Sequence, residues 1–149
     1  PADGRVVSVV RVARGPLLEQ AETQVSIFLS PADVHINRAP VAGVVGELQY
    51  TQGKFFAAYK SEASTRNEQN ALRIVDHQGR PVSVVQVAGV LARRIVCRVK
   101  KGDFLERGAR FGLIMFGSRT DLYLPAGVSI EVAEGQRVKG GKTIIGRFV

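Results

Sequence analysis

The chain has 149 residues, of which 45% are hydrophobic and 23% charged, a composition that indicates one globular domain and excludes a disordered chain. A single cysteine, Cys97, excludes an intramolecular disulfide, and two histidines argue against a histidine-rich metal site, so no metal is predicted. The formal charge of +8 predicts attraction to polyanions, either nucleic acid or an anionic lipid surface.

Short apolar runs separated by glycine turns predict many strands. The turn at 76–79 joins two of these runs in a hairpin. In chain order, the predicted strands span residues 6–12, 22–29, 44–50, 72–74, 81–90, 94–99, 112–116, 121–124, 128–132 and 143–145.

Two segments carry helical signals. In Ser30-Pro31-Ala32-Asp33, a serine precedes a proline and an acid follows, which is typical of a helix start, so we expect one helical turn that carries His35. Residues 56–64 fit either a short helix or an irregular loop.

Together these elements predict a mainly β fold, a sandwich/barrel-like hybrid with one or two short helices, formed by residues 1–149 as a single domain. Short internal repeats begin at Pro1 and Pro40, and again at Val99 and Val132. These units are similar to the hairpins of lipoyl and biotinyl carriers. A carrier presents a lysine at a hairpin tip, commonly beside a methionine. No lysine adjoins Met115, the one methionine, so a carrier function is not favoured.

Gly117-Ser118 is a small polar joint between the apolar runs 112–116 and 121–124. Taken alone it predicts a turn, although glycine tolerates strained backbone angles and serine is a potential nucleophile. His35 in its polar loop and Asp3 before a glycine likewise have ordinary structural interpretations when each is considered alone.

Four motifs in order change that interpretation: Pro1-Ala2-Asp3-Gly4, the run 30–35 that ends in His35, Arg66-Asn67-Glu68, and Phe116-Gly117-Ser118. Over essentially its whole length the chain resembles the phosphatidylserine decarboxylase family in its short bacterial and archaeal form. Many members have Leu-Gly-Ser-Thr where this chain has Phe116-Gly117-Ser118-Arg119, a variant that short forms share. Longer members also have a second histidine where this chain has Arg38.

The resemblance implies an enzyme that cleaves itself between Gly117 and Ser118, giving chains 1–117 and 118–149. Ser118 would attack the carbonyl of Gly117, His35 would take the serine proton, and Asp3 would orient the imidazole. The cofactor would be a pyruvoyl group derived from Ser118, which forms a Schiff base with phosphatidylserine and leads to phosphatidylethanolamine. Arg93 and Arg94 are candidates to hold the phosphate or carboxylate of the substrate.

The implied partner is phosphatidylserine in an anionic membrane surface, with no nucleic acid. The implied location is the cytoplasmic face, with an anchor upstream of Pro1, and a homodimer is the suggested assembly. The alternative function is a basic, non-enzymatic β-sandwich module that binds nucleic acid or anionic surfaces. Such a module would bind oligonucleotides with strong salt dependence.

Overall fold

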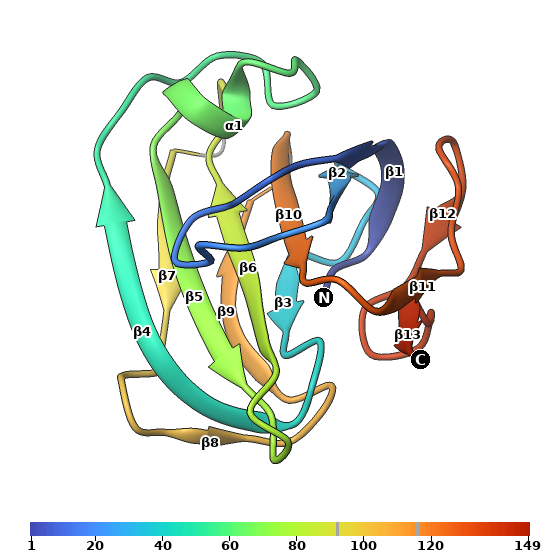
Figure 1. The fold of residues 1–149 in the computed structure, drawn as a ribbon. Coiled ribbons are helices and arrows are strands. Elements are labelled where there is room, and N and C mark those ends of the chain that lie inside the picture. Colours follow the sequence, from blue (N-terminus) through green and yellow to red (C-terminus); the bar gives the residue numbers. More distant parts are fainter. Residues whose placement is uncertain (92, 116) are drawn as a thin grey trace.

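The computed structural model describes residues 1–91, 93–115 and 117–149, and in them the chain is mainly β, with one short helix, α1 (Ala63–Arg66) (Figure 1). In chain order the strands are β1 (Gly4–Arg11), β2 (Thr23–Leu29), β3 (Ile36–Arg38), β4 (Gly43–Thr51), β5 (Gln69–Val75), β6 (Pro81–Val87), β7 (Ile95–Cys97), β8 (Phe104–Leu105), β9 (Arg110–Ile114), β10 (Ser118–Leu124), β11 (Val128–Ile130), β12 (Arg137–Val138) and β13 (Gly146–Phe148).

The largest sheet has eight strands in the order β12-β1-β2-β10-β6-β5-β4-β8, with every pairing antiparallel. Register shifts at Val6/Ser8 in β1 and at Val45/Glu47 in β4 interrupt the ladders, and such bulges bend a strand. The sheet curls as a result, and its concave side encloses the main core (Figure 1).

Strand β10 lies in the middle of this sheet, and all seven of its residues are buried. Because successive side chains of a strand point to opposite faces, the strand divides into two sets. Leu122 and Leu124 belong to the main core, so Ser118 and Thr120 share that inner face. Tyr123 belongs to a second, smaller cluster on the outer face.

A three-stranded sheet, β3-β9-β7, packs on the inner face. Two polar contacts tie it to the large sheet: Asn37 Nδ2 donates to Thr120 Oγ1 at 3.0 Å, and Gln86 Nε2 donates to the carbonyl of Val96 at 2.9 Å. The C-terminal residues add a separate two-stranded sheet, β11-β13, and lie beside the N-terminus because β12 pairs with β1.

The prediction of a mainly β fold is confirmed, as is the hairpin around 76–79, now β5 and β6. The predicted helical turn at 30–35 is wrong, because Asp33 N donates to Ser30 O in a single turn and the chain then enters β3. The predicted strand 143–145 is also wrong, since the pairing with β11 begins at Gly146.

Residues 56–64, which fitted either a helix or a loop, form both: an irregular segment leads into α1 at Ala63. In the part of the chain that the structure describes, no helix has the length and hydrophobicity needed to cross a bilayer.

Candidate active site around Gly117 and Ser118

The Gly117–Ser118 peptide bond lies where the chain enters β10. Gly117 has φ +77°, a left-handed conformation that L side chains rarely adopt, and its N–H donates to the carbonyl of Leu29 at 2.7 Å. Ser118 is fully buried, and its hydroxyl donates to the carbonyl of Met115 at 2.6 Å. The sequence predicted a joint before the strand, but Ser118 is instead the first residue of the strand itself, opposite Leu29 of β2. Phe116, the first residue of the predicted motif, lies outside the described residues.

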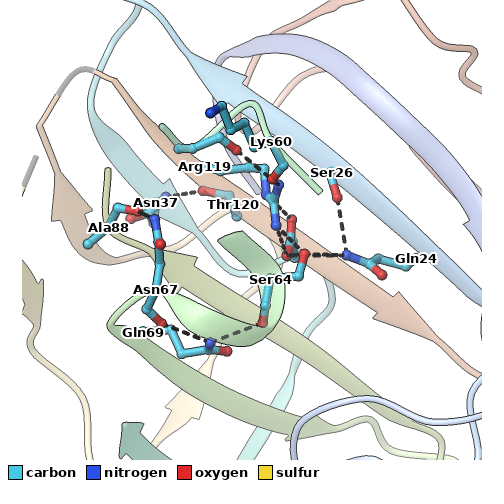
Figure 2. Close-up of polar contacts among 12 residues, drawn as sticks. Gln24, Ser26, Asn37, Lys60, Ser64, Asn67, Gln69, Ala88, Arg119 and Thr120 are labelled. Carbon is cyan, nitrogen blue, oxygen red and sulfur yellow. Dashed lines mark hydrogen bonds and ion pairs between the residues drawn. The ribbon is translucent and has the colours of Figure 1, made fainter. Parts of the chain in front are cut away.

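The carbonyl of Gly117 faces Gly89. A Cβ added at Gly89 would lie 1.8 Å from the oxygen of Gly117 and 2.9 Å from its carbonyl carbon, distances that only glycine permits. The segment before Gly89 is held in place by Asn67, whose Nδ2 donates to the carbonyl of Ala88 at 2.7 Å (Figure 2). The carbonyl that Ser118 would have to attack is therefore held against a backbone segment that is itself pinned.

His35 reaches the same region from the loop between β2 and β3. Its backbone carbonyl accepts a hydrogen bond from the N–H of Ile114. Ile114 is followed by Met115, whose carbonyl accepts from the Ser118 hydroxyl. The loop is built on Asp33, whose Oδ2 accepts from the N–H and the hydroxyl of Ser30 at 2.8 Å each, and whose Oδ1 accepts from Arg137 at 2.8 Å. The structure thus brings the His35 segment and the Ser118 segment together.

Asp3 lies at the same end of the sheet, with strand β2 between it and Ser118. The pairing of Arg5 with Phe28 places Gly4 beside Leu29, whose other neighbour is Ser118. Two strand spacings, about 10 Å, therefore separate the β1 and β10 backbones at this level. The described contact of the Asp3 carboxylate is with the N–H of Gly140, at 2.7 Å.

Arg93 and Arg94 follow Gly89 in the exposed loop before β7, not on a strand. The Nε of Arg93 donates to the carbonyl of Val90 at 2.8 Å, and its guanidinium lies 5.0 Å from the centre of the Phe55 ring. Both arginines are exposed, so a charged group of a ligand could reach them.

Sequence reasoning missed a buried polar network on the outer face of β10 (Figure 2). Arg119 and Asp121 form an ion pair at 2.8 Å with side chains that are 2% and 1% exposed. Arg119 also donates to the carbonyls of Ala58 and Lys60 at 2.9 Å each, and Ser64 donates to Asp121 at 2.9 Å. The available signal was the run of polar residues 118–121 opening a strand whose later residues are apolar.

A second polar chain lies on the inner face. Thr120 accepts from Asn37, whose Oδ1 accepts from Gln86 Nε2 at 3.0 Å, and Gln86 Oε1 in turn accepts from Asn70 at 3.0 Å. All four residues are buried, and each bond satisfies a group that would otherwise be costly to bury.

On the outer face, burial and then the negative charge of Asp121 raise the pKa of the Tyr123 phenol, so this group is neutral at ordinary pH.

Comparison with known proteins finds relatives over nearly the whole chain. The family model for phosphatidylserine decarboxylase matches residues 1–146. A phosphatidylserine decarboxylase proenzyme from Gluconobacter oxydans is 52% identical over an alignment that covers 99% of this chain and 67% of that protein. Proteins with the same description from Granulibacter bethesdensis and Magnetococcus marinus are 52% and 47% identical, over 97% and 99% of this chain and 61% and 68% of their own lengths. The chain therefore spans about two thirds of the length of these relatives.

Proposed function

Because the chain belongs to the phosphatidylserine decarboxylase family, we propose that it is a self-processing, pyruvoyl-dependent enzyme that converts phosphatidylserine to phosphatidylethanolamine. The observation that carries the proposal is the local structure around the Gly117–Ser118 peptide bond. A left-handed glycine precedes a buried serine, and the carbonyl between them is pressed against Gly89.

In the first step the Ser118 oxygen bonds to the carbonyl carbon of Gly117 and the amide nitrogen of Ser118 leaves it, so the peptide becomes an ester. A base then removes the Cα proton of residue 118, and the Gly117 carboxylate departs from its Cβ. Water replaces the nitrogen of residue 118, which is lost as ammonia, and a pyruvoyl group is left at the new N-terminus. No redox partner is required.

Proton transfer in these steps is assigned to His35. The Ser118 hydroxyl donates to the carbonyl of Met115, which is too weak a base to keep the proton, so the hydroxyl must turn to a stronger acceptor before it attacks. The backbone contact between His35 and Ile114, the residue before Met115, supports this assignment because it joins the His35 segment to the segment that leads to Ser118. Asp3 contributes a negative charge across β2, and its bond to Gly140 fixes its position.

The residues around Ser118 fit the product group, because the buried start of a central strand keeps a new N-terminus in place and shields it from water. Once formed, the pyruvoyl group supplies the carbonyl that binds the substrate amine and accepts electrons as carbon dioxide leaves. Arg93 and Arg94 would hold the phosphate or carboxylate of the substrate, for which a guanidinium is well suited.

The net charge of +8 supports action at an anionic membrane surface and not on a neutral one. The homodimer and the cytoplasmic face stay predictions.

An intact mass spectrum tests the proposal. Wild-type protein should give two chains, 1–117 and 118–149, the second with a mass that fits a pyruvoyl group in place of Ser118. The variant Ser118→Ala should give one chain of about the 16.1 kDa calculated for the whole sequence, and no decarboxylase activity. Active protein with Ser118 still in an unbroken chain would rule out the mechanism.

A further inference from the structure

The end of the molecule that holds Gly117 and Ser118 also exposes large apolar side chains. Tyr59, Leu91 and Met115 are 62%, 71% and 45% exposed, and Val90 beside Leu91 is 46% exposed. They lie on three loops, one at residues 57–60, one at residues 88–91 and the one that carries Met115.

These three loops meet one another. The backbone at Gly89 approaches the carbonyl of Gly117, and a Cβ at Gly89 would lie 3.4 Å from the Cβ of Ala58. Arg119, the second residue of β10, donates to the carbonyl of Ala58 at 2.9 Å. The loops that carry the exposed apolar side chains therefore lie next to the Gly117–Ser118 bond, at the end of the molecule where α1 lies (Figure 1).

Cations are interspersed with these apolar side chains. Five exposed ones occur on this end: Lys54, Lys60, Arg66, Arg93 and Arg94. Two of them lie over phenylalanine rings, with Arg66 5.5 Å from the centre of the Phe56 ring and Arg93 5.0 Å from that of Phe55. In residues 54–68 and 88–94 the sequence has these five cations and two acids, Glu62 and Glu68, so this end carries a net positive charge.

We propose that this docking face, formed by Tyr59, Val90, Leu91 and Met115 with the five surrounding cations, binds the surface of an anionic phospholipid bilayer. Apolar tips enter the boundary between headgroups and acyl chains, while lysine and arginine stay at the level of the phosphates. The inference rests on the proposed function in one respect: docking in this orientation brings a lipid headgroup to Ser118 without removing the lipid from the membrane.

Vesicle sedimentation tests the docking face with the full chain. The vesicles contain phosphatidylcholine with about a third phosphatidylglycerol, which is anionic but lacks serine, so binding does not depend on decarboxylation. Neutralising two cations in Arg93→Gln/Arg94→Gln should weaken binding roughly 25-fold, about fivefold for each charge. Leu91→Asp should weaken it by on the order of tenfold or more, because an apolar anchor becomes an anion.

Matched controls come from the opposite end of the molecule, around β8 (Figure 1). Phe104→Asp replaces a side chain that is 60% exposed, and Lys101→Gln/Arg107→Gln removes two exposed cations. Both controls should bind vesicles nearly as well as wild type. Thermal unfolding checks that each variant is folded, and the two docking-face variants are independent, so the failure of one to fold leaves the other to decide.

Three results would overturn the proposal. The first is wild-type protein that does not bind the vesicles, and the second is an equal loss of vesicle binding in docking-face and control variants, which would indicate diffuse attraction by the overall charge. The third is a dimer that Leu91→Asp dissociates while vesicle binding persists. Cleavage at Gly117–Ser118, followed by mass in the same samples, reports the proposed function separately. Cleaved protein that does not bind refutes docking alone, and uncleaved protein that binds refutes the processing alone.

Discussion

The substitution Gly89→Ala should slow the proposed self-cleavage strongly while leaving the sheet intact. The added Cβ would lie 1.8 Å from the oxygen of Gly117, whereas real Cβ contacts are essentially never shorter than 3.0 Å, so the two segments must separate by at least 1.2 Å. Neither segment can yield easily. The atoms in conflict are backbone atoms, and Asn67 and Glu68 bind the backbone of Ala88 on one side while Leu29 binds the N–H of Gly117 on the other.

Overpacking of this kind costs about 1–3 kcal/mol of folding free energy, which a domain of ordinary stability survives. A displacement of about 1 Å at a reacting carbonyl can cost on the order of 100-fold in rate. We therefore expect a folded protein that matures about 100-fold more slowly than wild type, because the carbonyl of Gly117 moves away from the Ser118 hydroxyl.

The assay follows the fraction of cleaved chain with time by denaturing gel and intact mass. Gly46→Ala is the matched control, since its Cβ would meet side-chain atoms and no backbone, Arg73 at 3.2 Å and Val75 at 3.5 Å. It should mature at the wild-type rate. Comparing Gly89→Ala/Ser118→Ala with Ser118→Ala in thermal unfolding measures the stability cost without interference from cleavage. Maturation of Gly89→Ala at the wild-type rate would refute the reasoning.

Two further predictions concern buried carboxylates. Asp33→Ala removes the carboxylate that accepts hydrogen bonds from Ser30 and Arg137. It should lower the free energy of unfolding by about 1–3 kcal/mol, measured by urea unfolding, and slow maturation in the gel assay. An unchanged maturation rate would contradict a positioning role for Asp33. Burial alone would raise the pKa of Asp76, but hydrogen bonds from Arg80 and Gln78 outweigh it and lower this pKa below the usual 3.8. The ionised Asp76 carboxylate therefore stabilises the folded state above pH 3.8, and this contribution is lost as pH falls through the lower folded pKa. In urea unfolding, Asp76→Ala should be clearly less stable than wild type at pH 7, and the difference in unfolding free energy should shrink in strong acid. A difference that does not change with pH would contradict this.

Local patterns predicted the long strands well, because alternation and turn chemistry are encoded by neighbouring residues. β1, β2 and β4 each lie within two residues of their predicted bounds. The pattern at 30–33 shows where this fails. Asp33 does bind the N–H of Ser30, as in a capping box, yet no helix follows. A few residues on, Asn37 has to reach Thr120 on β10, and this long-range contact draws the chain into β3.

The candidate site was predictable only in part. The resemblance supplied Asp3, His35 and Ser118, and the structure adds Gly89 as the residue in contact with the scissile carbonyl. Nothing local in the sequence links positions 89 and 117, because their contact depends on how β6 and β10 are aligned in the sheet. Arg119 and Asp121 were missed for a similar reason: charged residues usually indicate an exposed face, and these two are buried because they pair with each other.

The position of β10 bears on what would happen after the proposed cleavage. Breaking the bond before Ser118 severs the chain in the middle of an eight-stranded sheet, yet β10 keeps its ladders to β2 and β6 on either side. Arg119 adds bonds from the second residue of the new chain to the carbonyls of Ala58 and Lys60 in the old one. The ion pair with Asp121 holds that guanidinium in place. Under the proposed cleavage, Arg119, which stands where many members have threonine, would anchor the new N-terminus and keep the group formed from Ser118 in place.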